Sequence, residues 1–118
     1  MKKIAMGLVL IFSQFANSWS ADLLPLEVRA KSVGLENSAT CWMASVFAQG
    51  VFTGNPDQQD LLEFAQNLQG IYNSYGDFLV GQQEFNRVLQ RKSSVWKTLS
   101  EQQQVATWKQ CTDLWQAR

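Results

Sequence analysis

The chain contains 118 residues, with 10 basic and 10 acidic side chains, two cysteines and no histidine. The absence of histidine and the wide separation of the two cysteines exclude a zinc site of the usual cysteine and histidine type. The lack of a basic excess or a basic cluster argues against nucleic acid as a partner.

Residues 1–20 have the features of a secretory signal peptide. Two lysines precede an apolar segment at 4–15, which is shorter than the roughly 20 residues needed to span a bilayer, and small residues lead up to Ser20. We therefore predict cleavage after Ser20 and a mature, single helical domain at 21–118. We also predict a periplasmic location and no transmembrane segment after cleavage.

The first predicted helices lie at 25–34 and 36–51. The first follows Pro25 and ends about Gly34. The second has two stripes with helical spacing. The large apolar residues of one stripe are Met43, Val46, Phe47 and Val51, with Gly50 among them, and the small residues of the other are Cys41, Ala44, Ser45 and Ala48. The small stripe would let another helix approach closely.

A third helix is predicted to begin at Asn55. Gly54 interrupts the previous pattern, Asn55 is a favourable N-cap, and Pro56 suits the first helical position. The residues expected on its buried face are Leu61, Phe64, Ala65, Leu68, Ile71, Tyr72 and Tyr75.

Two further helices complete the prediction. Gly76 is expected to end the third helix and Asp77 to cap a fourth, which closes at the RKSS segment, 91–94. Its inward residues would be Phe78, Gly81, Phe85, Val88 and Leu89. The last helix starts at a capping box formed by Ser100 and Gln103, and its buried face would hold Val105, Trp108, Cys111, Thr112 and Trp115. The fold predicted is an all-α bundle of four or five helices.

The two cysteines, Cys41 and Cys111, are interpreted as one disulfide. Without histidine the usual means of activating a catalytic cysteine is absent, and an exported protein with an even cysteine count favours oxidation. Only one intramolecular pairing exists, and an intermolecular bridge is the alternative. In the chain-entropy model, closing a loop of about 70 residues stabilises a protein by roughly 4 kcal/mol.

The sequence offers little for catalysis. It has no glycine-rich phosphate loop and no recognisable serine nucleophile. The acidic residues near 57–63 are better explained by the dipole of a helix start than by calcium. A pair of carboxylates across a cleft could still cleave glycosides. We predict no enzymatic activity, no cofactor and no metal.

Aromatic residues outside the predicted helices are the remaining feature. Phe52 lies beside the Gly54 turn, and Trp96 lies in the expected connector SSVWKTL, 93–99. Exposed loop aromatics are typical anchors of protein interfaces. The alternative is that these loops fold back over the core.

In length, export signal, helical content and cysteine pair, the chain resembles the small disulfide-bridged periplasmic immunity proteins of type VI secretion effectors. The resemblance implies a non-enzymatic inhibitor that neutralises a cell-wall-targeting toxin, which would be a secreted hydrolase. The complex would be one-to-one, or two-to-two if the inhibitor is a homodimer. It also implies that loop residues plug the active site of this protein partner, namely Phe52, Asn55, Tyr75, Asp77 and Trp96.

Two other functions remain open from the sequence. One is an accessory or structural subunit of an envelope or secretion assembly, which would use its apolar helix faces for permanent association. The other is a carrier whose bundle encloses a small apolar ligand.

Overall fold

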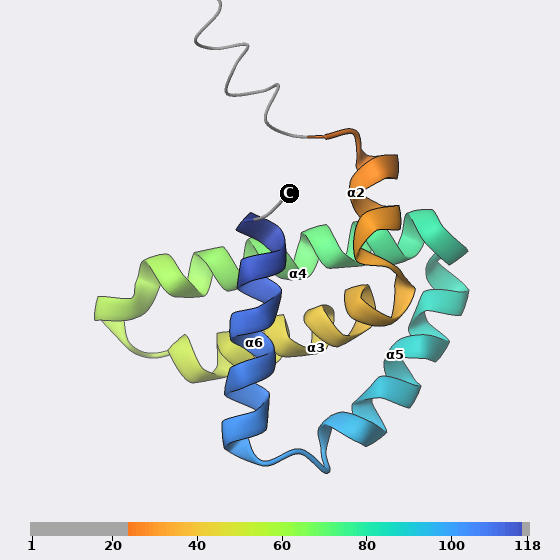
Figure 1. The fold of residues 1–118 in the computed structure, drawn as a ribbon. Coiled ribbons are helices and arrows are strands. Elements are labelled where there is room, and N and C mark those ends of the chain that lie inside the picture. Colours follow the sequence, from red (N-terminus) through yellow and green to blue (C-terminus); the bar gives the residue numbers. More distant parts are fainter. Residues whose placement is uncertain (1–23, 117–118) are drawn as a thin grey trace, which may run out of the picture.

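A computed structural model describes residues 24–116, so the predicted signal peptide lies outside the described residues. The described part of the chain forms five α-helices and one short 3₁₀ helix, and it contains no strand (Figure 1). The predicted all-α bundle is thereby confirmed. None of the helices in this range is both long and apolar enough to cross a membrane.

The first two helices begin and end close to their predicted positions. Helix α2 spans Leu26–Val33 and helix α3 spans Leu35–Phe52. Gly34 separates them with a φ of 84°, a left-handed conformation that a glycine adopts without strain. The sharp change of direction at this glycine lays α2 across the bundle rather than in line with α3 (Figure 1).

The turn after α3 also follows the sequence prediction. The Asn55 side chain accepts a hydrogen bond from the backbone N–H of Asp57 at 3.0 Å, and the 3₁₀ helix η1 covers Pro56–Gln58. Helix α4, Gln59–Val80, continues directly from η1. The predicted N-cap is confirmed, although the first turn is 3₁₀ rather than α.

The predicted end of this helix at Gly76 is wrong, and so is the cap at Asp77. Helix α4 runs through both residues and ends at Gly81, which has a φ of 86°. Gly76 is buried because the Phe85 ring packs directly on its backbone: a Cβ atom at this position would lie 2.2 Å from the ring. The glycine therefore permits a close helix approach instead of ending a helix.

Helix α5, Gln82–Trp96, begins later than predicted and passes through the RKSS segment. Arg91 and Lys92 pair with Glu36 of α3, so these cations join two helices. Trp96 is the last residue of α5, and the connector reduces to 97–100.

Helix α6, Glu101–Gln116, starts at the predicted capping box. The backbone N–H of Ser100 donates to Gln103 Oε1 at 2.9 Å, and the N–H of Gln103 donates to Ser100 Oγ at 3.2 Å. This reciprocal pair satisfies two backbone donors that a helix start leaves without partners.

Helix α3 is the centre of the bundle and packs against α4, α5 and α6 (Figure 1). Its small-residue stripe is buried, as predicted, whereas Val46 and Val51 of the large-residue stripe are 40% and 52% exposed. Small side chains let three neighbouring helices approach α3, so that stripe became the core. Leu61, Phe78 and Val105, which were expected to be buried, are 45%, 45% and 37% exposed.

The disulfide between Cys41 and Cys111 is confirmed as intramolecular. It joins α3 to α6 across 70 residues of sequence, with 5.5 Å between the two Cα atoms. Beside it, the Tyr72 hydroxyl of α4 donates to the Cys111 carbonyl at 2.7 Å. Three helices are therefore fixed together at one point.

Candidate binding pocket around Arg29

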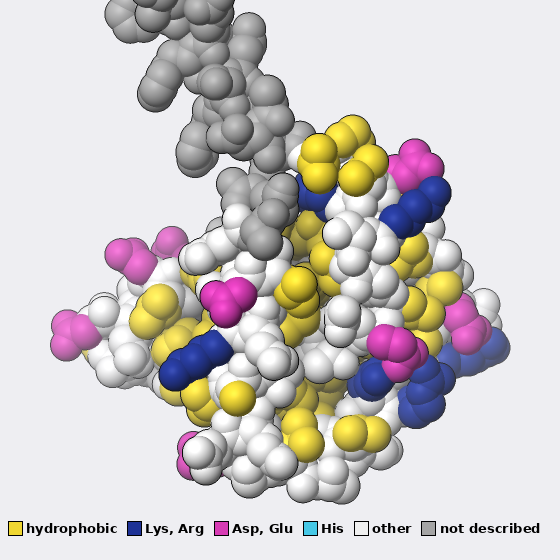
Figure 2. Space-filling view, in the orientation of Figure 1, with side chains coloured by type: hydrophobic (Ala, Val, Ile, Leu, Met, Phe, Trp, Pro, Cys, Tyr) yellow, Lys and Arg dark blue, Asp and Glu magenta, His cyan; other side chains and the backbone are white. Residues whose placement is uncertain are grey.

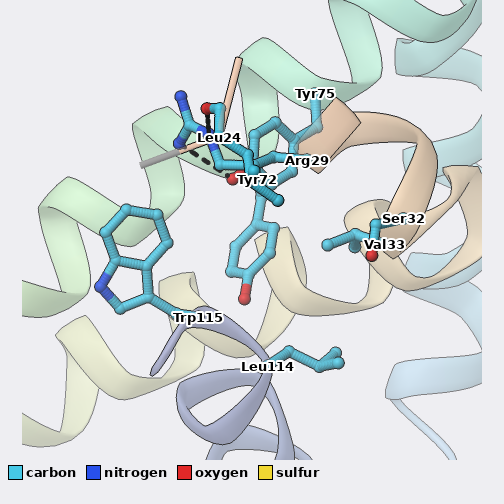
Figure 3. Close-up of a pocket in the computed structure, with 8 residues that line it drawn as sticks. All are labelled: Leu24, Arg29, Ser32, Val33, Tyr72, Tyr75, Leu114 and Trp115. Carbon is cyan, nitrogen blue, oxygen red and sulfur yellow. Dashed lines mark hydrogen bonds between the residues drawn. The ribbon is translucent and has the colours of Figure 1, made fainter. Parts of the chain in front are cut away.

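A pocket of about 150 Å³ opens where α2, α4 and the end of α6 meet (Figure 3). We call it the Arg29 pocket. Its described lining is mixed, with one cation, three aromatic side chains, one serine and three aliphatic side chains; these residues are Leu24, Arg29, Ser32, Val33, Tyr72, Tyr75, Leu114 and Trp115. Segments at both ends of the described range thus form one site.

Arg29 is held in place by two hydrogen bonds. Its Nε donates to the Leu24 carbonyl at 2.6 Å, and its Nη1 donates to the Tyr75 hydroxyl at 3.3 Å. The guanidinium carbon also lies 5.9 Å from the centre of the Tyr75 ring, within cation–π range. Within residues 24–116, no carboxylate forms an ion pair with Arg29, so its positive charge is unbalanced in that part of the chain.

Two tyrosines from α4 form the inner wall of the pocket. Tyr72 and Tyr75 are 1% and 2% exposed, and their rings meet edge to face with centroids 5.7 Å apart. Burial raises the pKa of the Tyr72 hydroxyl well above its usual value, and the neighbouring Tyr75 raises it further. Tyr72 therefore stays protonated at neutral pH and serves as a hydrogen-bond donor, not as a base.

The outer part of the pocket is apolar and accessible. Leu24 and Leu114 are 43% and 38% exposed, although both line the pocket. Figure 2 shows hydrophobic atoms at the surface between α6 and α2, while most charged side chains lie toward the edges of this face. The result is a partly buried cation and aromatic rings behind a rim of exposed leucines.

The groups that the pocket offers are those of a binding site. No carboxylate is found among the described residues that line the pocket, and the Tyr72 hydroxyl already donates to a backbone carbonyl. Residues 24–116 contain no group of three or more histidine, cysteine or acidic side chains placed to hold a metal ion. Both cysteines are in the disulfide. The Arg29 pocket offers a positive charge, donors and apolar contact, which are the elements of recognition.

The residues expected to contact a partner do not gather at one place. Phe52, at the end of α3, is partly buried, and the exposed Asn55 is used as the cap of η1. Asp77 is exposed but lies 18 residues beyond the start of α4, about 27 Å along the helix at 1.5 Å per residue. Figure 1 shows the turn after α3 and the junction of α4 with α5 at opposite ends of the bundle.

Four of the five expected contact residues are helical rather than on loops, since only Asn55 lies in a turn. Trp96 is partly buried at the end of α5, where its ring packs edge to face on Phe47 at 5.8 Å between centroids. The Trp96 ring is thus folded over the core, the alternative left open by the sequence. Tyr75 lies inside α4, and it alone among the five lines the Arg29 pocket.

Arg29 itself was missed by the sequence reasoning. Its position gave a usable signal, because it lies three residues after Leu26 and four before Val33, on an apolar stripe of a predicted helix. A basic residue on such a stripe either extends to solvent or enters a site. The partners that decide between these outcomes, Leu24 and Tyr75, are known only once α2 is placed against α4.

No protein-family model, curated protein or solved structure matches this chain.

Proposed function

We propose that the protein is a non-enzymatic binding module of the periplasm that neutralises a cell-wall-targeting toxin by binding it. The observation that carries the proposal is the Arg29 pocket, in which arginine, tyrosine and tryptophan lie behind exposed leucines. Arginine, tyrosine and tryptophan dominate the binding energy of protein interfaces, and they do so when nearby apolar contacts exclude water.

The disulfide supports the compartment in this proposal. A bond between Cys41 and Cys111 is typical of oxidising environments such as the periplasm, and it agrees with the signal peptide expected at 1–20. It also stiffens the site, because Leu114 and Trp115 follow Cys111 by three and four residues on α6. A rigid site loses less entropy when it binds a partner.

The size of the pocket favours a protein partner over an apolar-ligand carrier. Pockets that enclose drug-sized ligands measure roughly 300 to 1,000 Å³, and the Arg29 pocket measures about 150 Å³. A lipid chain would exceed it several-fold. One side chain of a partner protein would fill it.

The test is capture of the target followed by an activity assay. Oxidised mature protein, residues 21–118, would be immobilised and incubated with envelope and secreted fractions, and the captured proteins would be identified by mass spectrometry. We expect one hydrolase, held in fixed molar ratio and inhibited when the purified protein is added. Light scattering of the complex would separate one-to-one from two-to-two binding.

Matched variants make this test specific for the pocket. Arg29→Met removes the central cation, and Lys31→Met removes a cation from the same helix that lines no part of the pocket. We expect capture and inhibition to weaken at least tenfold for Arg29→Met alone. Recovery of a multi-protein envelope complex would instead favour the accessory subunit, and co-purified lipid without a protein partner would favour the carrier; either result contradicts the proposal.

A further inference from the structure

We propose that the Arg29 pocket is a carboxylate site that binds one carboxylate joined to one apolar group of about the size of a single ring. The inference rests on the proposed function only in using the same pocket, and it adds the chemistry of the ligand. It is argued from the donors of Arg29, the charge of the lining and the volume.

The first step concerns the donors of Arg29. A guanidinium group has five N–H donors, and acceptors within residues 24–116 take two of them, the Leu24 carbonyl and the Tyr75 hydroxyl. Three donors are therefore left for an acceptor beyond this part of the chain. Because the Nε and Nη1 contacts fix the plane of the group, it is already oriented for a planar acceptor such as a carboxylate.

The second step concerns the charge of the ligand. Arg29 supplies the only charged side chain among the described residues that line the pocket. One positive charge balances a monoanion. A phosphate dianion would bring a second negative charge against the apolar side chains of Leu24, Val33 and Leu114, at a high desolvation cost. The lining thus favours a carboxylate over a phosphate.

The third step concerns the size and shape of the apolar part. A cavity of about 150 Å³ lined by aliphatic and aromatic side chains is large enough to bind benzene, and the Arg29 pocket has this volume. Figure 3 shows Arg29 beside Tyr75, with Tyr72, Leu114 and Trp115 extending along the same space. A ring or a branched aliphatic group joined to the carboxylate would contact these side chains.

Such a ligand group has two sources, a free aromatic acid and the C-terminal residue of a partner protein. Phenylacetate represents the first source. An acetylated tripeptide that ends in phenylalanine with a free carboxylate represents the second. The neutral counterparts, phenylacetamide and the same peptide with a C-terminal amide, keep the shape and remove the charge.

In the experiment, oxidised residues 21–118 are titrated with these four probes, and binding is monitored by two-dimensional amide NMR. For a probe of one ring we expect a dissociation constant on the order of 1 mM, which NMR measures well. Each acid should bind at least tenfold more tightly than its amide, because charge-assisted hydrogen bonds to arginine exceed neutral ones. The shifted amides should lie in α2, in α4 near Tyr72 and in the last turn of α6.

Four variants test the assignment to Arg29. Arg29→Met should abolish the preference for the acid over the amide, Arg29→Lys should keep part of it, and Lys31→Met should leave it unchanged. Tyr75→Phe keeps the ring and removes one fixing contact of the guanidinium, so it should weaken acid binding several-fold. Equal affinity for acid and amide in the wild-type protein, or an unchanged preference in Arg29→Met, would overturn the site.

The two proposals fail separately. If a hydrolase is captured and inhibited, with a loss in Arg29→Met, but neither acid binds more tightly than its amide, the inhibitor function stands and the carboxylate site is wrong. If the acids bind through Arg29 but no protein is captured, the site stands and the proposed function is wrong. Tighter binding of the peptide acid than of phenylacetate by tenfold or more would assign the site to a partner's C-terminus, and the reverse order would assign it to a free acid.

Discussion

Two parts of the core hold this bundle together in different ways. The disulfide cluster lies where α2, α3, α4 and α6 meet, and its buried residues are Ala30, Cys41, Ala44, Leu68, Tyr72, Tyr75 and Cys111. The Phe85 cluster, which consists of Ala39, Phe85 and Val88, holds α5 against α3. Trp42 packs against both clusters. The disulfide cluster has a covalent bond and a buried hydrogen bond, whereas the Phe85 cluster depends on the fit of one ring against a glycine.

The difference has a consequence for the Arg29 pocket. Tyr72 and Tyr75 belong to the disulfide cluster and also line the pocket, so the cross-linked part of the core supports the candidate site. None of the residues of the Phe85 cluster lines it. Damage to the Phe85 cluster should therefore lower the free energy of unfolding without changing the pocket, and damage to the disulfide cluster should change both.

The largest effect is expected from removal of the disulfide. Replacing Cys41 and Cys111 together by alanine should lower the free energy of unfolding by about 4 kcal/mol, because a 70-residue loop in the unfolded chain is no longer closed. Urea unfolding followed by circular dichroism measures this change. Binding of the acid probes should weaken as well, since α6 loses its link to α3.

Reduction of the wild-type protein is the control for this pair of substitutions. It should reproduce the loss of stability, while the reductant should leave the double variant unchanged. A loss below about 1 kcal/mol would show that packing alone fixes α6, and the contrast between the two clusters would then be wrong.

The sequence predicted the parts of the fold that depend on local chemistry. The Asn55 cap and the Ser100 and Gln103 capping box are confirmed because each is formed within three residues of sequence. The disulfide is confirmed because only one intramolecular pairing of the two cysteines existed.

The errors occurred where a distant neighbour decides the outcome. A glycine such as Gly76 is typical of a helix end, but here the Phe85 ring of the next helix packs on it. Trp96 has a polar sequence context, yet Phe47 of α3 covers its ring. The candidate site was missed for the same reason, because it joins Arg29 of α2 to Tyr75, 46 positions away, and to the end of α6.

The second largest effect is expected from a substitution at Gly76, on which the ring of the Phe85 cluster packs. In Gly76→Ala the added methyl group would lie 2.2 Å from the Phe85 ring, so the ring or the helix must shift. We expect a loss of about 2 kcal/mol in the free energy of unfolding, as is usual for overpacked cores. Acid binding at the Arg29 pocket should not change.

Gly70→Ala is the matched control in the same helix. A Cβ atom at Gly70 meets nothing within 4 Å, so alanine should raise stability by up to about 1 kcal/mol through its helix propensity. Phe85→Leu should restore part of the stability lost in Gly76→Ala by making room for the methyl group. If both glycine variants gained stability, the close contact between α4 and α5 would be refuted.

The smallest effect is expected from the surface ion pairs beside the Phe85 cluster. A hydrogen bond from Lys92 lowers the pKa of the Glu36 carboxyl, burial opposes this shift, and the charges of Lys92 and Arg91 add to the lowering. Because the folded-state pKa lies below the unfolded value of about 4.3, the stabilisation is present at neutral pH and is lost as the pH falls through the folded-state pKa. The Glu36 side chain is 59% exposed, which limits the effect to less than about 1 kcal/mol.

Glu36→Gln tests both the sign and the size of this contribution. At pH 7 and low salt the variant should be less stable than the wild type by a few tenths of a kcal/mol. The difference should vanish as the pH falls through the folded-state pKa, below which the wild-type carboxyl is protonated as well, and it should shrink in about 1 M salt because exposed charges are screened. A difference that persisted in acid would mean that Glu36 contributes through packing rather than charge. The ion pairs would then have no part in holding α5, and the Phe85 cluster would depend on ring and glycine alone.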